Sequence, residues 1–180
     1  MIIRCTMKLM KEMGLNPKSP TVDTGTSTIL GDWHANLFYL DRKKNVIFCN
    51  DKALYTVIAF QVNREQIRGL GKLLRRELGK TLLEDGVDDA LIQKLVEEVK
   101  DVSFSPTNNR KVIGTMVDHV KCMWSYIDNP ETGWSEENLI NTVKLLNRTP
   151  MLAPAYVYAV DLLGVLLGIK ISTKKDWLGL

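Results

Sequence analysis

Residues 30–51 read LGDWHANLFYLDRKKNVIFCND, which is two apolar segments joined by a short charged turn. The segments HANLFYL and NVIFC carry the aromatic and β-branched residues that favour strands. The polar residues between them are typical of a hairpin turn. The stretch therefore predicts a β-hairpin, and its open end contains His34, one of the two histidines in the chain.

The segments around this hairpin predict a mixed architecture. The apolar run at 2–5 predicts a strand, and ALYTVIAF at 53–60 predicts a third strand that extends the hairpin into a meander. Helical spacing of apolar residues marks about five further segments, and strands and helices do not alternate regularly. We therefore expect an α+β domain with a mainly antiparallel or mixed sheet, built from the N-terminal strand plus the β-meander and covered by about five helices.

Three of these helices have defined ends or faces. Asn63 is placed to cap a helix that Gly79 closes, and Ser135 is placed to cap a later one. The longest helix follows Asn109, and its apolar residues predict a single buried face. That face comprises Ile113, Met116, Val117, Val120, Trp124 and Ile127.

Length and composition bound the domain organisation. The chain has 180 residues, of which 45% are hydrophobic, and this is enough for one core but short for two independent domains. We expect a single domain spanning 1–180, with a surface loop at 16–28 and a C-terminal tail at 172–180.

The cysteines and the apolar runs indicate a cytoplasmic protein. Three widely spaced cysteines, Cys5, Cys49 and Cys122, fit neither a disulfide framework nor a CxxC metal site. The N-terminus lacks the apolar core of a secretory signal. The apolar run at 152–169 contains Asp161 near its centre, so it predicts buried core and no membrane association.

The register of the hairpin decides what His34 faces. A turn of two or four residues centred on Arg42 and Lys43 would pair His34 with Asp51 on one face of the sheet. An imidazole opposite a carboxylate suits a general base or a ligand-binding histidine. A structural pair without a catalytic role is the alternative interpretation.

Two Asn-Arg segments could contribute to the same site. Asn109 and Arg110 lie at a predicted helix N-terminus, where free N–H groups and a guanidinium can bind an anion. Asn147 and Arg148 form a similar segment before a proline. Both segments have a simpler interpretation, which is that they cap or terminate helices.

Basic residues also recur along the predicted helix at 63–79. Segment 63–80 has six Lys/Arg and two Glu, and a stripe of this kind could track a phosphate backbone. Segment 84–101 has seven Asp/Glu and two Lys, so pairing between the two segments is the alternative. The stripe comprises Arg64, Arg68, Lys72, Arg75 and Arg76.

Several enzyme classes lack their motifs in this sequence. It contains no P-loop, no GxGxxG after a strand, no GxSxG and no HExxH. Two histidines and three scattered cysteines provide no metal-binding motif. We therefore expect no metal or cofactor, and whether the protein is an enzyme stays open.

Four stretches, MIIRCT, LGDWHANL, TNNRKVIGTMVD and LNRTPM, resemble an uncharacterised bacterial family known as domain of unknown function 6933 (DUF6933). The resemblance spans Met1 to about Leu167, and LGDWHANL and NRTPM are its most specific parts. It implies a free-standing cytoplasmic bacterial protein. It implies no activity, cofactor or partner.

The leading interpretation is a small binding or interaction protein with a polar site at the open end of the hairpin, which takes a small anionic or polar ligand. A hydrolase that acts on a phosphoester or nucleic acid through His34 and Asp51 is one alternative, and nucleic-acid binding through the basic stripe is another. A homodimer is also compatible with the sequence. The ligand-binding candidates are Asp32, Trp33 (as a stacking surface), His34, Asn36, Asp51, Asn109, Arg110, Asn147 and Arg148.

Overall fold

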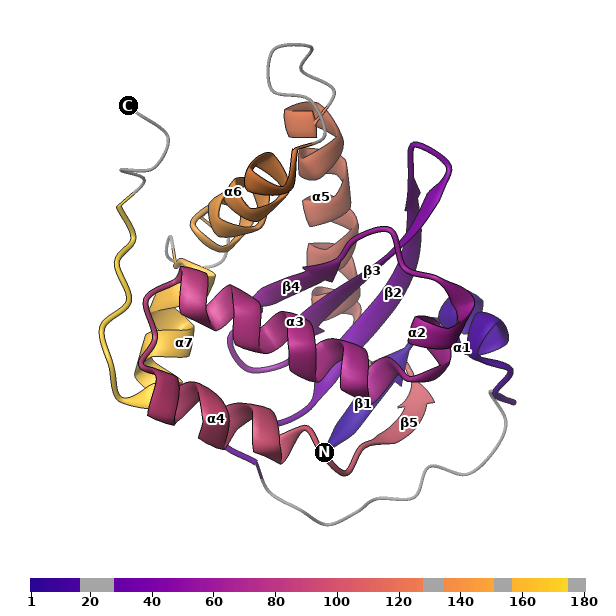
Figure 1. Ribbon diagram of the computed structural model, residues 1–180, viewed down its shortest axis with the longest axis horizontal. Coiled ribbons are helices and arrows are strands. Elements are labelled where there is room, and N and C mark those ends of the chain that lie inside the picture. Colours follow the sequence, from indigo (N-terminus) through magenta and orange to yellow (C-terminus); the bar gives the residue numbers. More distant parts are fainter. Residues whose placement is uncertain (17–27, 128–134, 151–156, 175–180) are drawn as a thin grey trace.

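The computed structural model describes residues 1–16, 28–127, 135–150 and 157–174. These residues form an α+β fold with five strands and seven helices (Figure 1). The strands are β1 (Ile2–Cys5), β2 (Trp33–Leu40), β3 (Lys43–Asn50), β4 (Thr56–Ala59) and β5 (Ser103–Pro106). The helices are α1 (Met7–Met13), α2 (Arg64–Arg68), α3 (Leu70–Glu84), α4 (Asp89–Glu98), α5 (Arg110–Ile127), α6 (Glu136–Asn147) and α7 (Ala159–Leu167).

The strands form one mixed sheet in the order β4-β3-β2-β1-β5. The meander β2-β3-β4 is antiparallel, whereas β1 runs parallel to both β2 and β5. The expected combination of an N-terminal strand and a β-meander is confirmed. The position of β5 beside β1 is a tertiary result, because 97 residues separate the end of β1 from the start of β5.

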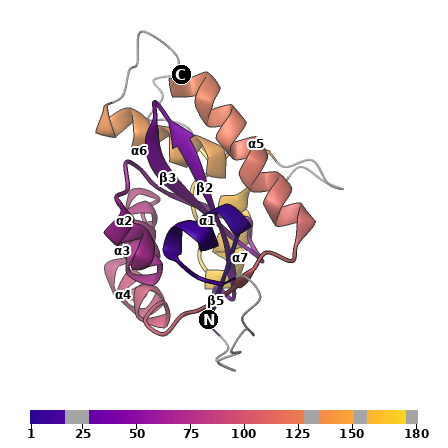
Figure 2. The same cartoon turned by 90° about the vertical axis from the view of Figure 1, so that its right-hand side faces the viewer.

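The sheet has a hydrophobic core on each face. One core joins Ile3, Trp33 and Phe48 to α1, α3, α4 and α7, and the other joins Phe38 and Ile47 to α5 and α6. Figure 2 shows α2, α3 and α4 on one side of the sheet and α5 on the opposite side. Residues 34 and 36 of β2 therefore face α5, while their neighbours Trp33 and Ala35 face the first core.

The hairpin turn differs from both predicted loops. It is shorter than the predicted loop of four residues, and it lies one residue earlier in the chain than the predicted loop of two residues. Asp41 and Arg42 alone form it, both with positive φ (44° and 59°), and Leu40 pairs with Lys43. Positive φ at both central residues is the geometry of a two-residue turn that matches strand twist. The paired positions are consequently displaced by two residues from the predicted register.

Helix boundaries differ from prediction along residues 63–84. Asn63 caps α2 through a capping box, as predicted, but the chain turns at Gly69 and α3 then continues past Gly79 to Glu84. Gly79 does not end the helix because Leu82, one turn beyond Leu78, is buried in the same core. This division, together with α7, raises the number of helices in the described residues above the expected five.

Helix α5 packs through a face that coincides only in part with the predicted one. Its buried residues are Val112, Met116, His119 and Met123, whereas Val117 and Trp124 are exposed. The side chain of Ile127 lies outside the described residues. The prediction was right for Met116 and in part for Ile113 and Val120, which pack half-buried against the core. It was wrong for Val117 and Trp124, because the helix turns the stripe of Val112, Met116, His119 and Met123 toward the sheet and α6. In α6, the Ser135 cap and the burial of Leu139, Val143 and Leu146 are confirmed.

Most of the predicted loop at 16–28 and of the predicted tail at 172–180 lies outside the described residues. The predicted buried segment at 152–169 is described from residue 157, and its residues Ala159–Leu167 form α7. Among the helices of the described ranges, none is sufficiently long and apolar to cross a membrane.

Candidate functional site

A row of polar side chains crosses the α5 face of the sheet. The strand registers place Ser105, Arg4, His34, Cys49 and Thr56 next to one another, one from each strand in the order β5-β1-β2-β3-β4. Residues at equivalent positions of neighbouring strands share one face of the sheet. The row therefore brings a guanidinium and an imidazole side by side near the open end of the hairpin.

His34 contacts Asp51, as predicted, although their register differs. His34 lies opposite Cys49, and Asp51 follows the end of β3 on the diagonal, with its Oδ1 2.5 Å from Nδ1 of the ring. A displacement of two residues leaves every side chain on its original face, whereas a displacement of one would have separated the pair. The contact therefore survives the error in the predicted turn.

The second ring nitrogen of His34 faces the start of α5. Its Nε2 accepts a long hydrogen bond, 3.5 Å, from the backbone N–H of Asn108, and the side chain is fully buried. One nitrogen donating to a carboxylate and the other accepting from an N–H describe a neutral imidazole. The nitrogen that a general base would use is thus occupied by the backbone and shielded from solvent.

Arg4 is the residue of this site that the sequence did not reveal. Its Nη2 donates to Asp32 Oδ2 at 2.9 Å, and its Nη1 lies 3.4 Å from Ser105 Oγ. Asp32 Oδ1 accepts from the backbone N–H of Ile2 at 2.9 Å, which fixes the carboxylate at the edge of β1. Arg4 was missed because its place depends on the parallel pairing of β1 with β2 and β5, for which a sequence gives no local signal. We call Arg4, Asp32, His34 and Asp51 the polar cluster.

The polar cluster is partly open to solvent. The side chains of Arg4, Asp32 and Asp51 retain 18%, 29% and 23% of their exposure, while His34 retains none. A ligand could therefore contact the guanidinium and both carboxylates without unfolding the sheet. With His34 neutral, the four side chains sum to one negative charge.

Three further candidates lie close to this cluster. Asn36 accepts a hydrogen bond from Thr6 Oγ1 at 2.8 Å, in the next row of the same face. Asn109 Oδ1 accepts from the N–H of Lys111 at 3.1 Å, so Asn109 caps α5, which was the simpler of its two interpretations. Arg110, the first residue of α5, is exposed.

Asn147 and Arg148 do not belong to the polar cluster. The Asn147 amide accepts from the N–H of Thr56 at 2.7 Å and donates to its carbonyl at 2.8 Å, so it completes the outer edge of β4. Arg148 is buried and pairs with Asp85 at 2.6 Å. Thr56 is two strands away from His34, a separation of about 10 Å. The prediction of one site that includes both Asn-Arg segments is therefore wrong.

Trp33 is also misplaced in the prediction. It precedes His34 on β2, so its side chain points to the opposite face, where it is fully buried in the core with α1 and α3. A fully buried ring offers no stacking surface to a ligand at the polar cluster. The alternation of side chains along a strand is the physical reason.

Cys49 lies beside His34 but does not form a reactive thiol–imidazole pair. Its Sγ is 3.5 Å from the carbonyl oxygen of Leu54, to which it donates. Burial raises the pKa of the Cys49 thiol to about 12. Because the thiolate is the nucleophilic form, this cysteine is inert near neutral pH.

The basic stripe lies on the far side of the sheet and is partly neutralised. Arg75 pairs with Glu97 of α4 at 2.6 Å, and Arg76 pairs with Glu77 at 2.5 Å. Figure 1 shows α4 running alongside α3. Four residues of the stripe, Arg64, Arg68, Lys72 and Arg76, are exposed.

Three hollows on the described surface also lie along α3, away from the polar cluster. The hollow between α3, α6 and β4 has a volume of about 440 Å³ and includes Ile58, Phe60 and Leu139. The other two, of about 460 and 380 Å³, share Lys72 and Arg76. None of these three hollows includes a residue of the polar cluster.

A family model described as a domain of unknown function, DUF6933, matches residues 2–162. The chain belongs to the DUF6933 family. The part of this DUF6933 protein that the family model matches includes all four residues of the polar cluster and ends within α7. No curated protein and no solved structure matches the chain.

Proposed function

We propose that this DUF6933 protein is a binding module that captures a small polar ligand at the polar cluster. The observation that carries the proposal is the adjacency of two hydrogen-bonded couples, Arg4 with Asp32 and His34 with Asp51, on one face of the sheet. Three of these side chains remain partly exposed beside the start of α5. A guanidinium and two carboxylates offer both donors and acceptors to a ligand.

The charge of the cluster narrows the class of ligand. A simple anion would meet two carboxylates around one guanidinium, so repulsion would offset much of its attraction to Arg4. A ligand that carries donors or a positive charge together with an acceptor suits the cluster better. We therefore propose a polar or zwitterionic small molecule, such as an amino acid or a nucleoside, in place of a simple anion.

Binding can be tested by recording amide chemical shifts of the ¹⁵N-labelled protein with panels of amino acids, nucleosides and monosaccharides. We expect a compound that shifts the amides around Arg4, His34 and Asp51. The isosteric substitutions Asp32→Asn and Asp51→Asn should weaken its binding by about tenfold each, the effect of a lost charge-assisted hydrogen bond.

Glu97→Gln is the matched control, because it removes a carboxylate from an ion pair on the other side of the sheet. It should leave binding unchanged. The proposal is wrong if no compound in the panels shifts these amides at millimolar concentration, or if Glu97→Gln weakens binding as much as Asp51→Asn.

A hydrolase is the second candidate, and the 2.5 Å contact between His34 and Asp51 is the observation that favours it. Against it, the Nε2 of His34 is buried and accepts from Asn108. We therefore expect no turnover of phosphomonoester or phosphodiester substrates. Turnover that His34→Gln abolishes while the protein stays folded would reverse this ranking.

We also propose a cytoplasmic location in a bacterial cell. The three cysteines support the first part, since each is a free thiol. Proteins of reducing compartments keep their thiols unpaired. The bacterial source rests on the sequence resemblance alone.

A further inference from the structure

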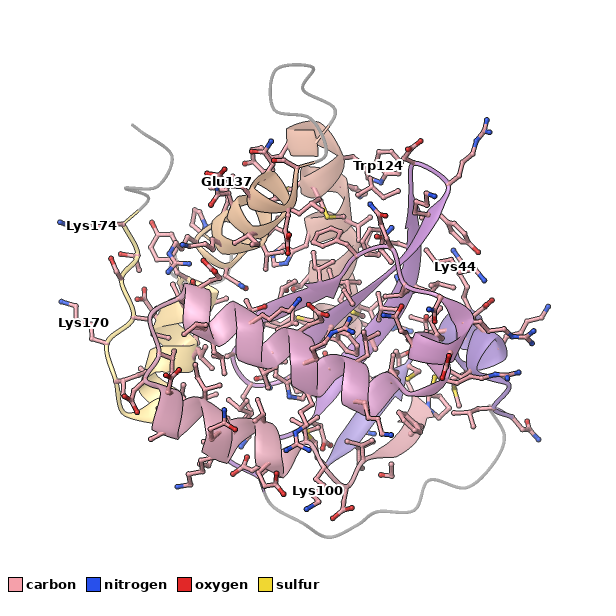
Figure 3. The ribbon with its side chains drawn as sticks, in the orientation of Figure 1. Lys44, Lys100, Trp124, Glu137, Lys170 and Lys174 are labelled. Atoms are coloured by element: carbon pink, nitrogen blue, oxygen red, sulfur yellow. The ribbon has the colours of Figure 1, made fainter. Side chains whose placement is uncertain are left out.

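Helix α5 carries an apolar stripe that the fold covers only in part. The stripe comprises Ile113, Val117, Val120 and Trp124, with spacings of four, three and four residues. Ile113 and Val120 are half-buried against the core that α5 shares with α6. Val117 and Trp124 retain 40% and 42% of their exposure, although both are large apolar side chains. Figure 2 shows α5 along one side of the molecule, and Figure 3 shows Trp124 near the C-terminal end of this helix.

The spacing of this stripe is that of a helix–helix seam. Alternating steps of three and four residues average 3.5, the repeat that keeps one face of a helix against another helix. Arg110 precedes Ile113 by three residues and is exposed, so it extends the seam to the first residue of α5.

We propose that the occupant of this face is α5 of a second copy of the chain, packed antiparallel about a two-fold axis. When the middle of the stripe lies on the two-fold axis, Val117 lies opposite the partner's Val120, and Trp124 lies opposite the partner's Ile113. The interface is self-complementary, as a two-fold contact must be. This proposal is independent of the ligand at the polar cluster.

Gly114 provides space for the largest side chain of the seam. A Cβ added to Gly114 would have no atom within 4 Å, so the fold of a single chain does not require a glycine there. Glycine weakens the interior of a helix, which makes its presence a cost to the isolated chain. The antiparallel alignment places the partner's Trp124 beside Gly114, where the missing side chain leaves room for the indole ring.

The charges on α5 favour the antiparallel direction. Arg110 and Lys111 occupy the first turn, where the helix dipole disfavours cations, and the last turn has no basic residue. An antiparallel partner brings Arg110 to the C-terminal end of the other helix, where a cation is favoured. A parallel pair would instead place the two Arg110 side chains together. The flank is neutral, because Lys121 pairs with Asp118 of its own helix.

Sedimentation velocity over a range of protein concentrations tests the dimer. One helix pair is a small interface, so we expect half-association on the order of tens of micromolar. Val117→Glu should weaken association at least about tenfold, because dimerisation would bury an unpaired charge. Val165→Glu is the matched control: Val165 is 80% exposed on α7, and its substitution should leave association unchanged.

Cross-linking tests the direction of the pair, with Cys122 replaced by Ser to remove the native half-buried thiol. A mixture of Ile113→Cys and Trp124→Cys chains should form a mixed disulfide, whereas neither variant alone should cross-link. A parallel seam predicts cross-links within each single variant.

Three results would overturn the proposal. They are a wild-type protein that stays at 20.4 kDa up to several hundred micromolar, a Val117→Glu variant that associates like wild type, and cross-links within the single variants. Circular dichroism of each variant would establish that a loss of association is not a loss of fold.

Discussion

At the scale of single residues, the two histidines are both buried but have different partners. His34 donates to the carboxylate of Asp51, whereas His119 lies 2.9 Å from the hydroxyl of Thr56 and has no carboxylate within hydrogen-bonding reach among the described residues. A buried histidine without a counter-charge resists protonation. Burial accordingly lowers the pKa of His119 from 6.5 to about 4.

This pKa predicts a loss of stability in acid. The folded protein keeps His119 neutral, while the unfolded chain takes up a proton near pH 6.5, so His119 stabilises the fold fully above pH 6.5. That stabilisation disappears as the pH falls from 6.5 toward 4, and it amounts to about 3 kcal/mol. Urea unfolding at pH 7 and pH 4.5 should show a smaller loss for His119→Gln than for wild type. Equal losses in the two proteins would contradict the assignment.

At the scale of the elements, buried polar side chains join helices that are distant in the sequence. Arg148 at the end of α6 pairs with Asp85 at the end of α3, and Asp85 also accepts from the hydroxyl of Tyr55 at 2.5 Å. The Nε of Arg148 donates to the carbonyl of Ser172 at 2.9 Å. One guanidinium therefore connects α3, α6, the start of β4 and the segment that follows α7.

Removing this guanidinium should be costly. Arg148→Met leaves the Asp85 carboxylate buried without its counter-charge, and we expect the free energy of unfolding to fall by about 3–5 kcal/mol. The double variant Arg148→Met/Asp85→Asn should recover part of that loss, because it removes the uncompensated charge. Urea denaturation of the two single variants and the double variant measures the coupling. Additive effects would show that the pair does not act as a unit.

At the scale of the whole molecule, charge is divided between neighbouring helices and largely cancels. Segment 63–80 carries a net charge of +4 and segment 84–101 carries −5, and the structure packs α3 of the first beside α4 of the second. The carboxylate of Glu97 forms ion pairs with both Arg75 and Lys100. These interactions lower the pKa of Glu97, and the hydrogen bond from Lys100 is the main cause. The acidic residues of α4 would oppose a polyanion that approaches α3, although Arg64, Arg68 and Lys72 remain exposed.

We therefore expect weak binding to nucleic acids. Fluorescence anisotropy with a labelled duplex and a labelled single strand should give dissociation constants above about 100 μM at physiological salt, the weak limit of non-specific binding. Arg68→Ala/Lys72→Ala should change neither value. Micromolar affinity that falls steeply with added salt, and that this double variant removes, would instead support the nucleic-acid interpretation of the stripe.

Local patterns in the sequence were sufficient for the hairpin, the meander, the capping residues Asn63 and Ser135, and the contact between His34 and Asp51. Each depends on neighbours in the chain or on the two-residue period of a strand. Because of that period, a register that was predicted two residues away from the observed one still placed each side chain on the correct face. The buried face of α5 was predicted only in part, because periodicity finds an apolar stripe but does not say which protein surface it meets.

The sequence by itself determined the α+β class, most of the elements and the faces of the strands, since these follow from periodicity and from local hydrogen bonding. Only the tertiary structure placed Arg4 beside His34, brought Asn147 to the edge of β4 and Arg148 to Asp85, and left Val117 and Trp124 of α5 exposed. Those outcomes depend on pairing between segments far apart in the chain. Such pairing is decided by the packing of the whole core and leaves no local pattern.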